Sequence, residues 1–134
     1  MKLLLDTHIL LWALADDDKL PMAARTLILD ESNEIMFSVA AAWEVAIKHS
    51  LKPDLMLVGA KELLGYCQQA GYEALPVQAR HVIALESLRR APDAHPHNDP
   101  FDRIMSAQAK ADSLMLLTHD SLIPDYQEPC ILWV

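Results

Sequence analysis

Short apolar runs alternate along this chain with longer stretches in which apolar residues recur at helical spacing. A short apolar run bounded by polar residues is typical of a buried strand, and a period near 3.6 residues is typical of an amphipathic helix. The pattern predicts strands at residues 2–5, 34–37, 72–77, 113–120 and 131–134. It predicts helices at residues 6–14, 22–32, 39–50, 57–69, 78–90 and 100–112. Strands and helices therefore alternate over the whole chain.

Residues at the ends of these segments support the boundaries. Ser38 precedes the helix at 39–50, where its hydroxyl can serve as the N-cap. Gly71 follows the helix at 57–69, and glycine commonly ends a helix. In the helix at 78–90, Val82, Ile83 and Leu85 form the apolar side.

The alternation of strands and helices predicts an α/β fold with a mostly parallel sheet and with helices on both faces. A length of 134 residues fits one domain. No repeat or linker divides the sequence, so we expect a single domain over residues 1–134. Ligands of such folds bind outside the carboxyl ends of the strands. Residues that directly follow predicted strands are therefore the strongest candidates for a functional site.

Composition narrows the class of protein. The chain is 52% hydrophobic and 22% charged, as a globular protein is. Its net charge is −8, from 19 acidic against 11 basic residues. It therefore lacks the broad basic surface that is typical of nucleic-acid-binding proteins. If the substrate carries phosphates, a bound divalent cation would have to supply positive charge locally.

Two features predict the cellular compartment. Cys67 and Cys130 show neither CxxC spacing nor a partner histidine at zinc-site spacing. We interpret both as small buried residues in a reducing compartment. No apolar run reaches the ~18 residues that span a bilayer, and Asp6 interrupts the first apolar run too early for a signal peptide. We expect a cytoplasmic protein without membrane contact.

Four acids fall at positions where they can meet. Asp6 follows the first predicted strand and Asp120 follows the fourth, so both are expected at the carboxyl edge of the sheet. Glu44 lies within "AAAWEVAIK", among residues that look buried, which is unusual for an acid. Asp102 lies in the first turn of the helix at 100–112. The positions share one predicted rim of the fold.

Each of these acids also has a purely structural interpretation. Asp6 can cap the helix that follows it, and Asp120 can start a turn. Glu44 can face solvent on an amphipathic helix. Asp99 and Asp102 have the spacing of a capping box, although its third position usually holds Glu or Gln. The sequence leaves both interpretations open for each residue.

A cluster of carboxylates has a direct chemical use. Close carboxylates repel one another, and in an empty site at least one would take a raised pKa. A divalent cation removes that conflict, and an all-oxygen donor set suits Mg²⁺ or Mn²⁺ rather than Zn²⁺. Such an ion activates water and stabilises in-line attack on a phosphodiester.

Four segments, together with their order, resemble a known family. They are "LLLDTHILLWAL", "SVAAAWEVAIK", "DPFDRIMSAQAKADSLMLLTHD" and the closing "ILWV". They look like a PIN-domain ribonuclease, and most like the VapC-like toxins of bacterial type II toxin–antitoxin pairs. The resemblance covers nearly the whole chain. It implies a PIN-like three-layer α/β/α fold around a central sheet of four to five mostly parallel strands.

The resemblance also implies a hydrolase, a Mg²⁺- or Mn²⁺-dependent endoribonuclease with a quartet of catalytic, metal-binding acids. On this chain the quartet matches Asp6, Glu44, Asp102 and Asp120. Asp102 matches because the third acid of the family precedes an Ala-rich helix, as in "DRIMSAQA". Asp99 is an additional acid of the "DPFDR" subgroup, and we expect it to cap the helix and to assist the site.

Other residues near these motifs are candidates for supporting roles. Thr7 and Thr118 fall where the family often has a hydroxyl beside the site, so we expect them to support the acids. Arg103, His119 and His97 are candidates for contact with RNA. The alternatives are a surface salt bridge for Arg103 and a solvated loop for His97, and His119 can equally lack a role.

The resemblance implies two protein partners, a second copy of the chain in a homodimer and a small antitoxin whose tail blocks the site. In toxins of this kind, apolar helices of the first half of the chain make both contacts. Leu11, Trp12 and Trp43 are the candidates here. Their alternative interpretation is as ordinary core residues.

Two other functions remain open from the residues alone. An α/β phosphatase could use Asp6 as a covalent nucleophile, although the usual catalytic lysine has no obvious place in this sequence. A non-catalytic partner-binding module would use the acids only for structure. We expect metal-dependent RNA hydrolysis, because four acids lie at one predicted edge and the resemblance spans the chain.

Overall fold

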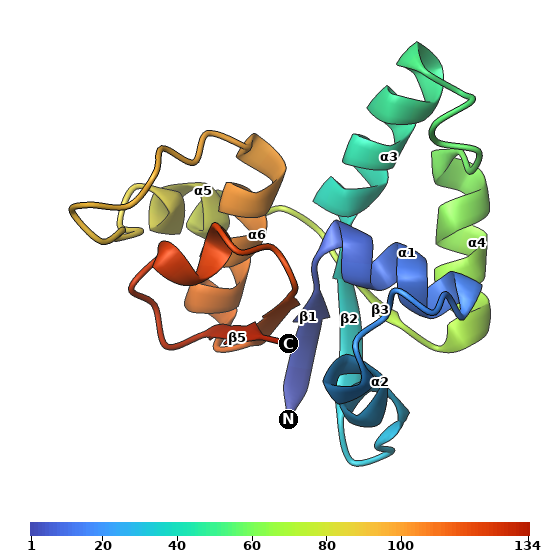
Figure 1. Ribbon diagram of the computed structural model, residues 1–134, viewed down its shortest axis with the longest axis horizontal. Helices are drawn as coiled ribbons and strands as arrows, with labels where there is room; N and C mark the ends of the chain where they lie inside the picture. Colours follow the sequence, from blue (N-terminus) through green and yellow to red (C-terminus); the bar gives the residue numbers. More distant parts are fainter.

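A computed structural model describes residues 1–134, and its centre is one five-stranded sheet (Figure 1). The strands are β1 (Lys2–Leu5), β2 (Glu34–Ser38), β3 (Glu73–Leu75), β4 (Met115–Thr118) and β5 (Ile131–Trp133). Their order across the sheet is β3-β2-β1-β4-β5, and every neighbouring pair is parallel. The predicted parallel sheet of four to five strands is confirmed.

Helices cover both faces of this sheet. They are α1 (Thr7–Ala15), α2 (Met22–Leu29), α3 (Val39–Leu51), α4 (Ala60–Ala70), α5 (Ala79–Leu85) and α6 (Pro100–Asp112), followed by a 3₁₀ turn, η1 (Ile123–Asp125). In Figure 1, α1, α3 and α4 lie on one side of the central strands, and α5 and α6 lie on the other. The three-layer arrangement expected from the sequence is therefore confirmed. No helix combines the length and the hydropathy that a membrane span requires.

The core explains why β1 stands at the centre. Leu3, Leu4 and Leu5 of β1 are fully buried, as are Leu116 and Leu117 of β4. A strand that is apolar on both faces can only lie between two layers of helices. Each fully buried leucine contributes about 1.5–3 kcal/mol to folding.

Several predicted helix ends are also confirmed. The Ser38 hydroxyl accepts a hydrogen bond from the Ala40 amide at 3.0 Å and caps α3. Gly71 ends α4 in the left-handed region, at φ +79°. Of the two cysteines, Cys67 is buried, as expected, and Cys130 is only half-buried.

The prediction for the helix at 78–90 is wrong in its length and in its orientation. The helix α5 ends at Leu85, and Val82 and Ile83 of its apolar side are 54% and 72% exposed. The fully buried residue of α5 is His81 instead. Its inward face is set by polar bonds, since His81 Nε2 lies 2.9 Å from Asp112 Oδ2 of α6. Hydrophobic periodicity cannot detect a face that is held in this way.

The order of the strands defines where a ligand can bind. The chain adds β2 and β3 on one side of β1 and then crosses over to add β4 and β5 on the other side. The crevice at such a reversal, outside the carboxyl ends of the strands, is where α/β folds bind ligands. Asp6 and Asp120 follow β1 and β4, the two strands that flank the reversal.

Candidate functional site

Asp6 lies at the carboxyl end of β1 and is only 3% exposed. It caps α1, because its Oδ1 accepts a hydrogen bond from the Ile9 amide at 2.9 Å. Its Oδ2 accepts a hydrogen bond from the Thr118 hydroxyl at 2.5 Å. Burial raises the pKa of Asp6 against these two bonds. Asp6 therefore serves as a helix cap and still faces the rim of the sheet.

Asp120 lies two residues beyond the end of β4 and is tied to the same threonine. Its amide donates to the Thr118 hydroxyl oxygen at 3.1 Å, and its Oδ1 accepts from the Leu122 amide at 2.9 Å. The predicted turn at Asp120 is thus present. Its Oδ2 receives no hydrogen bond from the protein. Thr118 joins the two rim acids, because it contacts the side chain of Asp6 and the backbone of Asp120.

Asp99 and Asp102 divide two tasks between them. The Asp99 carboxylate accepts hydrogen bonds from the amides of Phe101 and Asp102, at 2.9 and 3.1 Å, and so caps α6. Pro100 occupies the first helical turn, as the sequence predicts. Asp102 projects from that turn into the acid cluster and accepts none of these capping bonds.

The pKa of Asp102 reports how closely the acids gather. Burial, followed by the charges of Asp99, Asp120, Asp6 and Glu44 in that order, raises this pKa to about 8. All four predicted acids, with Asp99, therefore face one space. Without a cation, Asp102 is mostly protonated at pH 7.

His97 completes the nearest group of side chains. Its Nε2 lies 3.2 Å from Asp102 Oδ2, and its Nδ1 lies 2.8 Å from the Tyr126 hydroxyl. The ring is only 7% exposed, so the solvated-loop interpretation of His97 is wrong. Burial, and then the charge of Arg90, lower the pKa of His97. One potential ligand atom each from His97, Asp102 and Asp120 lie within 4.8 Å of one another.

Glu44 reaches the site from α3, but its carboxylate is already paired. The Thr7 hydroxyl donates to Oε1 and the Lys48 ammonium to Oε2, both at 2.6 Å. Glu44 is 4% exposed, so the solvent-facing interpretation is wrong. Lys48 compensates the buried charge from one helical turn away. The expected supporting position of Thr7 beside an acid is present.

The remaining candidates lie around this cluster. Arg103 lines a cavity of about 410 Å³ together with His97 and Tyr126. His119 is exposed, and its Nδ1 makes a short hydrogen bond to the main-chain oxygen of Val134. The sequence did not single out Tyr126, whose position in an irregular segment gives no periodic signal.

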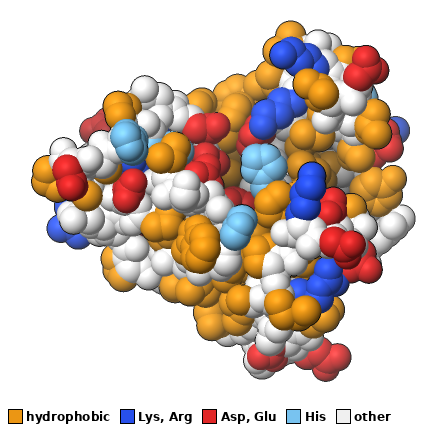
Figure 2. All heavy atoms as spheres, in the orientation of Figure 1, with side chains coloured by type: hydrophobic (Ala, Val, Ile, Leu, Met, Phe, Trp, Pro, Cys, Tyr) orange, Lys and Arg blue, Asp and Glu red, His pale blue; other side chains and the backbone are white.

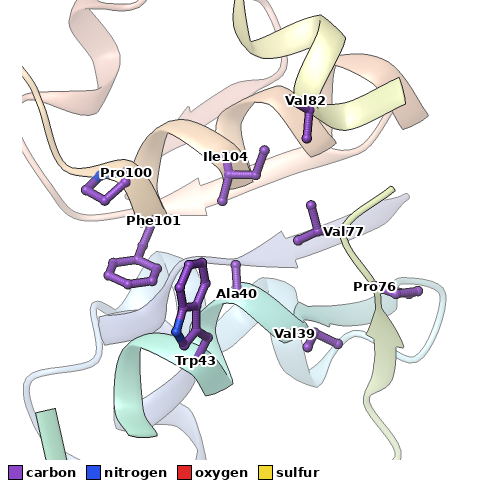
Figure 3. A pocket seen from close by; sticks show the side chains of 9 residues that line it. All are labelled: Val39, Ala40, Trp43, Pro76, Val77, Val82, Pro100, Phe101 and Ile104. Carbon is purple, nitrogen blue, oxygen red and sulfur yellow. The ribbon is translucent and has the colours of Figure 1, made fainter. Parts of the chain in front are cut away.

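An apolar groove adjoins the acids (Figure 3). Trp43 precedes Glu44 and Phe101 precedes Asp102, and their rings meet edge to face with centroids 5.3 Å apart. The groove has a volume of about 600 Å³, and Trp43 is 63% exposed, so its core interpretation is wrong. Leu11 lines a second groove, between α1 and α4, and Trp12 is half-buried.

The chemistry of the cluster fits a divalent cation. Carboxylate oxygens dominate the donor set, and a single imidazole nitrogen stands beside them. Such a set suits Mn²⁺ or Mg²⁺ better than the nitrogen- and sulfur-rich sites that bind Zn²⁺. Figure 2 shows acidic and histidine side chains gathered in the hollow at the middle of one face. The electrostatic strain at Asp102 is the kind that a bound cation relieves.

Two solved structures have a fold similar to that of this chain. One is a chain of VapBC2 from Rickettsia felis, in a complex with a DNA fragment of the VapBC2 promoter. It superposes on this chain with a TM-score of 0.68 at 18% sequence identity. The alignment covers 100% of this chain and 98% of that chain. FitAcB from Neisseria gonorrhoeae gives a TM-score of 0.54 at 19% identity, covering 90% and 89% of the two chains. Both likenesses concern the fold. No curated protein matches this sequence significantly.

The family itself is identified by sequence. The model of the PIN domain matches residues 3–128, which include all four acids, the strands β2, β3 and β4, and all of β1 except Lys2. This span is far more than half of the 134 residues. The chain therefore belongs to the PIN-domain family.

Proposed function

We propose that this protein is a divalent-metal-dependent endoribonuclease and the VapC-like toxin of a toxin–antitoxin pair. PIN domains are generally nucleases, and the two structural neighbours are from VapBC2 and FitAcB. The observation that carries the proposal is the gathering of acids around Asp102 at the point where the strand order reverses. A protein with no need to bind a cation gains nothing from this repulsion.

Asp102 and Asp120 would hold the cation, with Asp6 and Glu44 completing the acidic shell. The Oδ1 of Asp102 and the Oδ2 of Asp120 each receive no hydrogen bond from the protein. When bound, Mg²⁺ or Mn²⁺ would polarise a water molecule and neutralise charge on the phosphate. Thr118 fixes the orientation of Asp6, and Thr7 with Lys48 fixes that of Glu44. Orientation of ligands by such neighbours is typical of metal sites.

The same carboxylates can orient the attacking water. Carboxylate oxygens only accept hydrogen bonds when ionised, so Asp102 and Asp120 would align a water molecule through its hydrogens. His97 Nε2 contacts Asp102 Oδ2, and its Nδ1 contacts the Tyr126 hydroxyl, so both ring nitrogens of His97 have a partner. Arg103, which lines a cavity with His97, and the exposed His119, which precedes Asp120, would contact phosphate oxygens of the substrate. RNA as the substrate rests on the resemblance to VapC-like toxins.

We also propose an antitoxin and a second copy of the chain as partners. Two apolar grooves support this, one between α1 and α4 and one beside the acids around Trp43. Exposed apolar patches of this kind mark interaction surfaces in globular proteins. The groove of Trp43 would lie in the homodimer contact, and the groove of Leu11 would receive an apolar segment of the antitoxin.

The phosphatase alternative receives less support. A covalent nucleophile must reach the phosphorus atom, but Asp6 is 3% exposed and both of its carboxylate oxygens accept hydrogen bonds. Asp6 is better suited to hold charge than to attack. If no phosphorylated Asp6 can be trapped with a phosphate ester substrate, the phosphatase alternative is excluded.

The test is cleavage of an unstructured RNA by the purified, antitoxin-free protein in Mg²⁺ or Mn²⁺. Wild type should cut, chelation with EDTA should stop it, and Asp102→Asn should reduce cleavage below detection. Asp99→Asn is the matched control, because asparagine is an equally good cap, and it should stay within about tenfold of wild type. If wild type cuts no RNA under either metal, or Asp102→Asn cuts normally, the proposal is wrong.

A further inference from the structure

A row of aromatic rings, with exposed rings at both ends, lies next to the acid cluster. His8 and Trp12 of α1 stack with centroids 5.7 Å apart at 30°. Trp12 meets His119 edge-on at 6.3 Å, and His119 stacks on Trp133 of β5 at 5.1 Å and 23°. The four rings form a continuous row, and Trp133 at its end is 52% exposed. We call His8, Trp12, His119 and Trp133 the aromatic row.

The aromatic row is attached to the same elements as the acids. His8 lies close enough to Asp6 for its charge to lower the pKa of that carboxyl. His119 directly precedes Asp120 in the chain. Trp133 pairs in the parallel register with Thr118, whose hydroxyl bonds Asp6. The row and the acids therefore keep a fixed relation, since strand pairing and direct sequence adjacency link them.

Local bonds hold the exposed end of the row rigid. A carbonyl oxygen can only accept a hydrogen bond, so His119 Nδ1 must donate to the oxygen of Val134. This contact holds the imidazole of His119 beside the ring of Trp133, on which it stacks. The Val134 amide in turn donates to the Thr118 oxygen at 2.9 Å. A large aromatic face that is rigid before binding loses little entropy when a ligand stacks on it.

We propose that the aromatic row binds unpaired nucleobases of the RNA strand whose phosphate lies at the acids. This inference rests on the proposed nuclease function, and it adds a site beside the acids at which bases of the substrate stack. Bases stack on exposed aromatic side chains whatever their sequence. Bases inside a duplex are already stacked on each other and cannot lie on the row. An acidic protein also needs such a source of affinity, because it lacks a broad basic surface.

Binding without cleavage separates this inference from the proposed activity. All variants are built on Asp102→Asn, which the proposed function expects to be inactive, and RNA binding is measured by fluorescence anisotropy. The probes are a labelled unstructured RNA octamer, the abasic octamer with the same sugar–phosphate backbone, and the octamer in a duplex. Trp133→Ala tests the row, Trp133→Phe tests rescue, and Tyr66→Ala is the matched control. Tyr66 is 45% exposed in α4, outside the row.

The base-bearing octamer should bind more tightly than the abasic octamer and the duplex. Trp133→Ala should weaken binding of the base-bearing octamer about tenfold and leave the abasic octamer unchanged. Trp133→Phe should restore most of the loss, and Tyr66→Ala should bind like the parent. Thermal unfolding of each variant checks that the fold is retained.

Three results would overturn the inference. The parent could bind the base-bearing and abasic octamers equally or bind neither, or Trp133→Ala could bind RNA as Tyr66→Ala does. If the row instead governs association with protein, Trp133→Ala will change self-association and not RNA binding, which also overturns it. Loss of cleavage in wild type with intact, Trp133-dependent binding would refute the nuclease proposal alone.

Discussion

Asp102 is the acid of the cluster whose ionised form the burial and the neighbouring charges destabilise most clearly. Burial and four neighbouring carboxylates raise its pKa to about 8. In the metal-free protein, the folded state therefore binds a proton at Asp102 that the unfolded chain has already lost. The stability linked to this proton is fully present below about pH 4 and is lost as the pH rises through about 8. The ionised carboxylate of Asp102 therefore destabilises the metal-free folded protein most at alkaline pH.

Asp102→Asn should therefore stabilise the metal-free protein at pH 9. Removal of the ionised, buried carboxylate should raise the free energy of unfolding by about 1 kcal/mol after solvent screening is allowed for, or about 4 °C in the unfolding midpoint. Thermal unfolding in EDTA at pH 9 and pH 4 measures this. At pH 4 the difference should nearly vanish. Equal or lower stability of the variant at pH 9 would contradict the assigned surroundings of Asp102.

At the scale of residues, the sequence predicted the positions of the candidate acids where an acid ends a strand or starts a helix, and their roles stay predictions. Asp6, Asp102 and Asp120 stand at such places, and the structure brings them to one crevice. The partnership of His97 with Asp102 could not be predicted, because the loop that carries His97 has no periodicity. Glu44 and Lys48 have the four-residue spacing of ion pairs on a helix. The spacing alone does not show that the Glu44 side of α3 faces the interior.

At the scale of elements, a polar clamp replaces apolar packing between α5 and α6. Arg80 donates two hydrogen bonds to Asp112, at 2.8 and 3.0 Å, and His81 contacts the same carboxylate. The Arg80 bonds, more than those of His81, lower the pKa of Asp112 to about 2. The clamp explains why the periodicity of the sequence misplaced the inward face of α5. Boundaries set by caps were predicted well, because a cap is a local signal.

Asp112→Asn should loosen α5. The ionised Asp112 stabilises the fold above the unfolded pKa near 4, and this contribution is lost as the pH falls through about 2. The variant should lose about 1 kcal/mol at pH 7 with screening allowed for, and the loss should shrink toward pH 2. Denaturant unfolding at pH 7 and pH 3 measures both. Glu34→Gln, at an exposed pair 3.8 Å from Lys2, should change little, and equal effects of the two variants would refute the clamp.

Two glycines of α4 should respond in opposite directions to alanine. Gly71 has φ +79°, where a side chain is strained, so Gly71→Ala should destabilise the protein by about 1 kcal/mol. Gly65 lies inside the helix with open space around it, so Gly65→Ala should stabilise it by up to about 1 kcal/mol. Urea unfolding of the two variants decides the matter. The same sign for both would mean that the end of α4 is wrongly placed.

For the whole molecule, the alternation of short apolar runs with helical stretches was sufficient to predict the parallel α/β architecture. The order of the strands could not be read from the pattern, because the order depends on which edge each crossover joins. Interaction surfaces were predicted only in part. Trp43 was a candidate for partner contact, but the groove also takes residues from α5 and α6, such as Val82 and Ile104, which are distant in sequence.

Self-association should depend on the groove around Trp43. Trp43→Ser removes the largest exposed ring of that groove and should convert a dimer to a monomer in light scattering at micromolar concentration. Leu55→Ser is the matched control, since Leu55 is 77% exposed outside the groove. The Leu55→Ser variant should have the same mass in solution as the wild-type protein. A monomeric wild type, or an unchanged mass for Trp43→Ser, would refute the proposed homodimer contact.

The central claim is that the crevice between β1 and β4 holds the catalytic cation. Crystals of the protein soaked in Mn²⁺ test this most directly through the anomalous signal of the ion. The account predicts a peak in contact with the carboxylates of Asp102 and Asp120, and no such peak in crystals of Asp102→Asn. A wild-type crystal that binds Mn²⁺ only elsewhere, or not at all at saturating concentration, would contradict it.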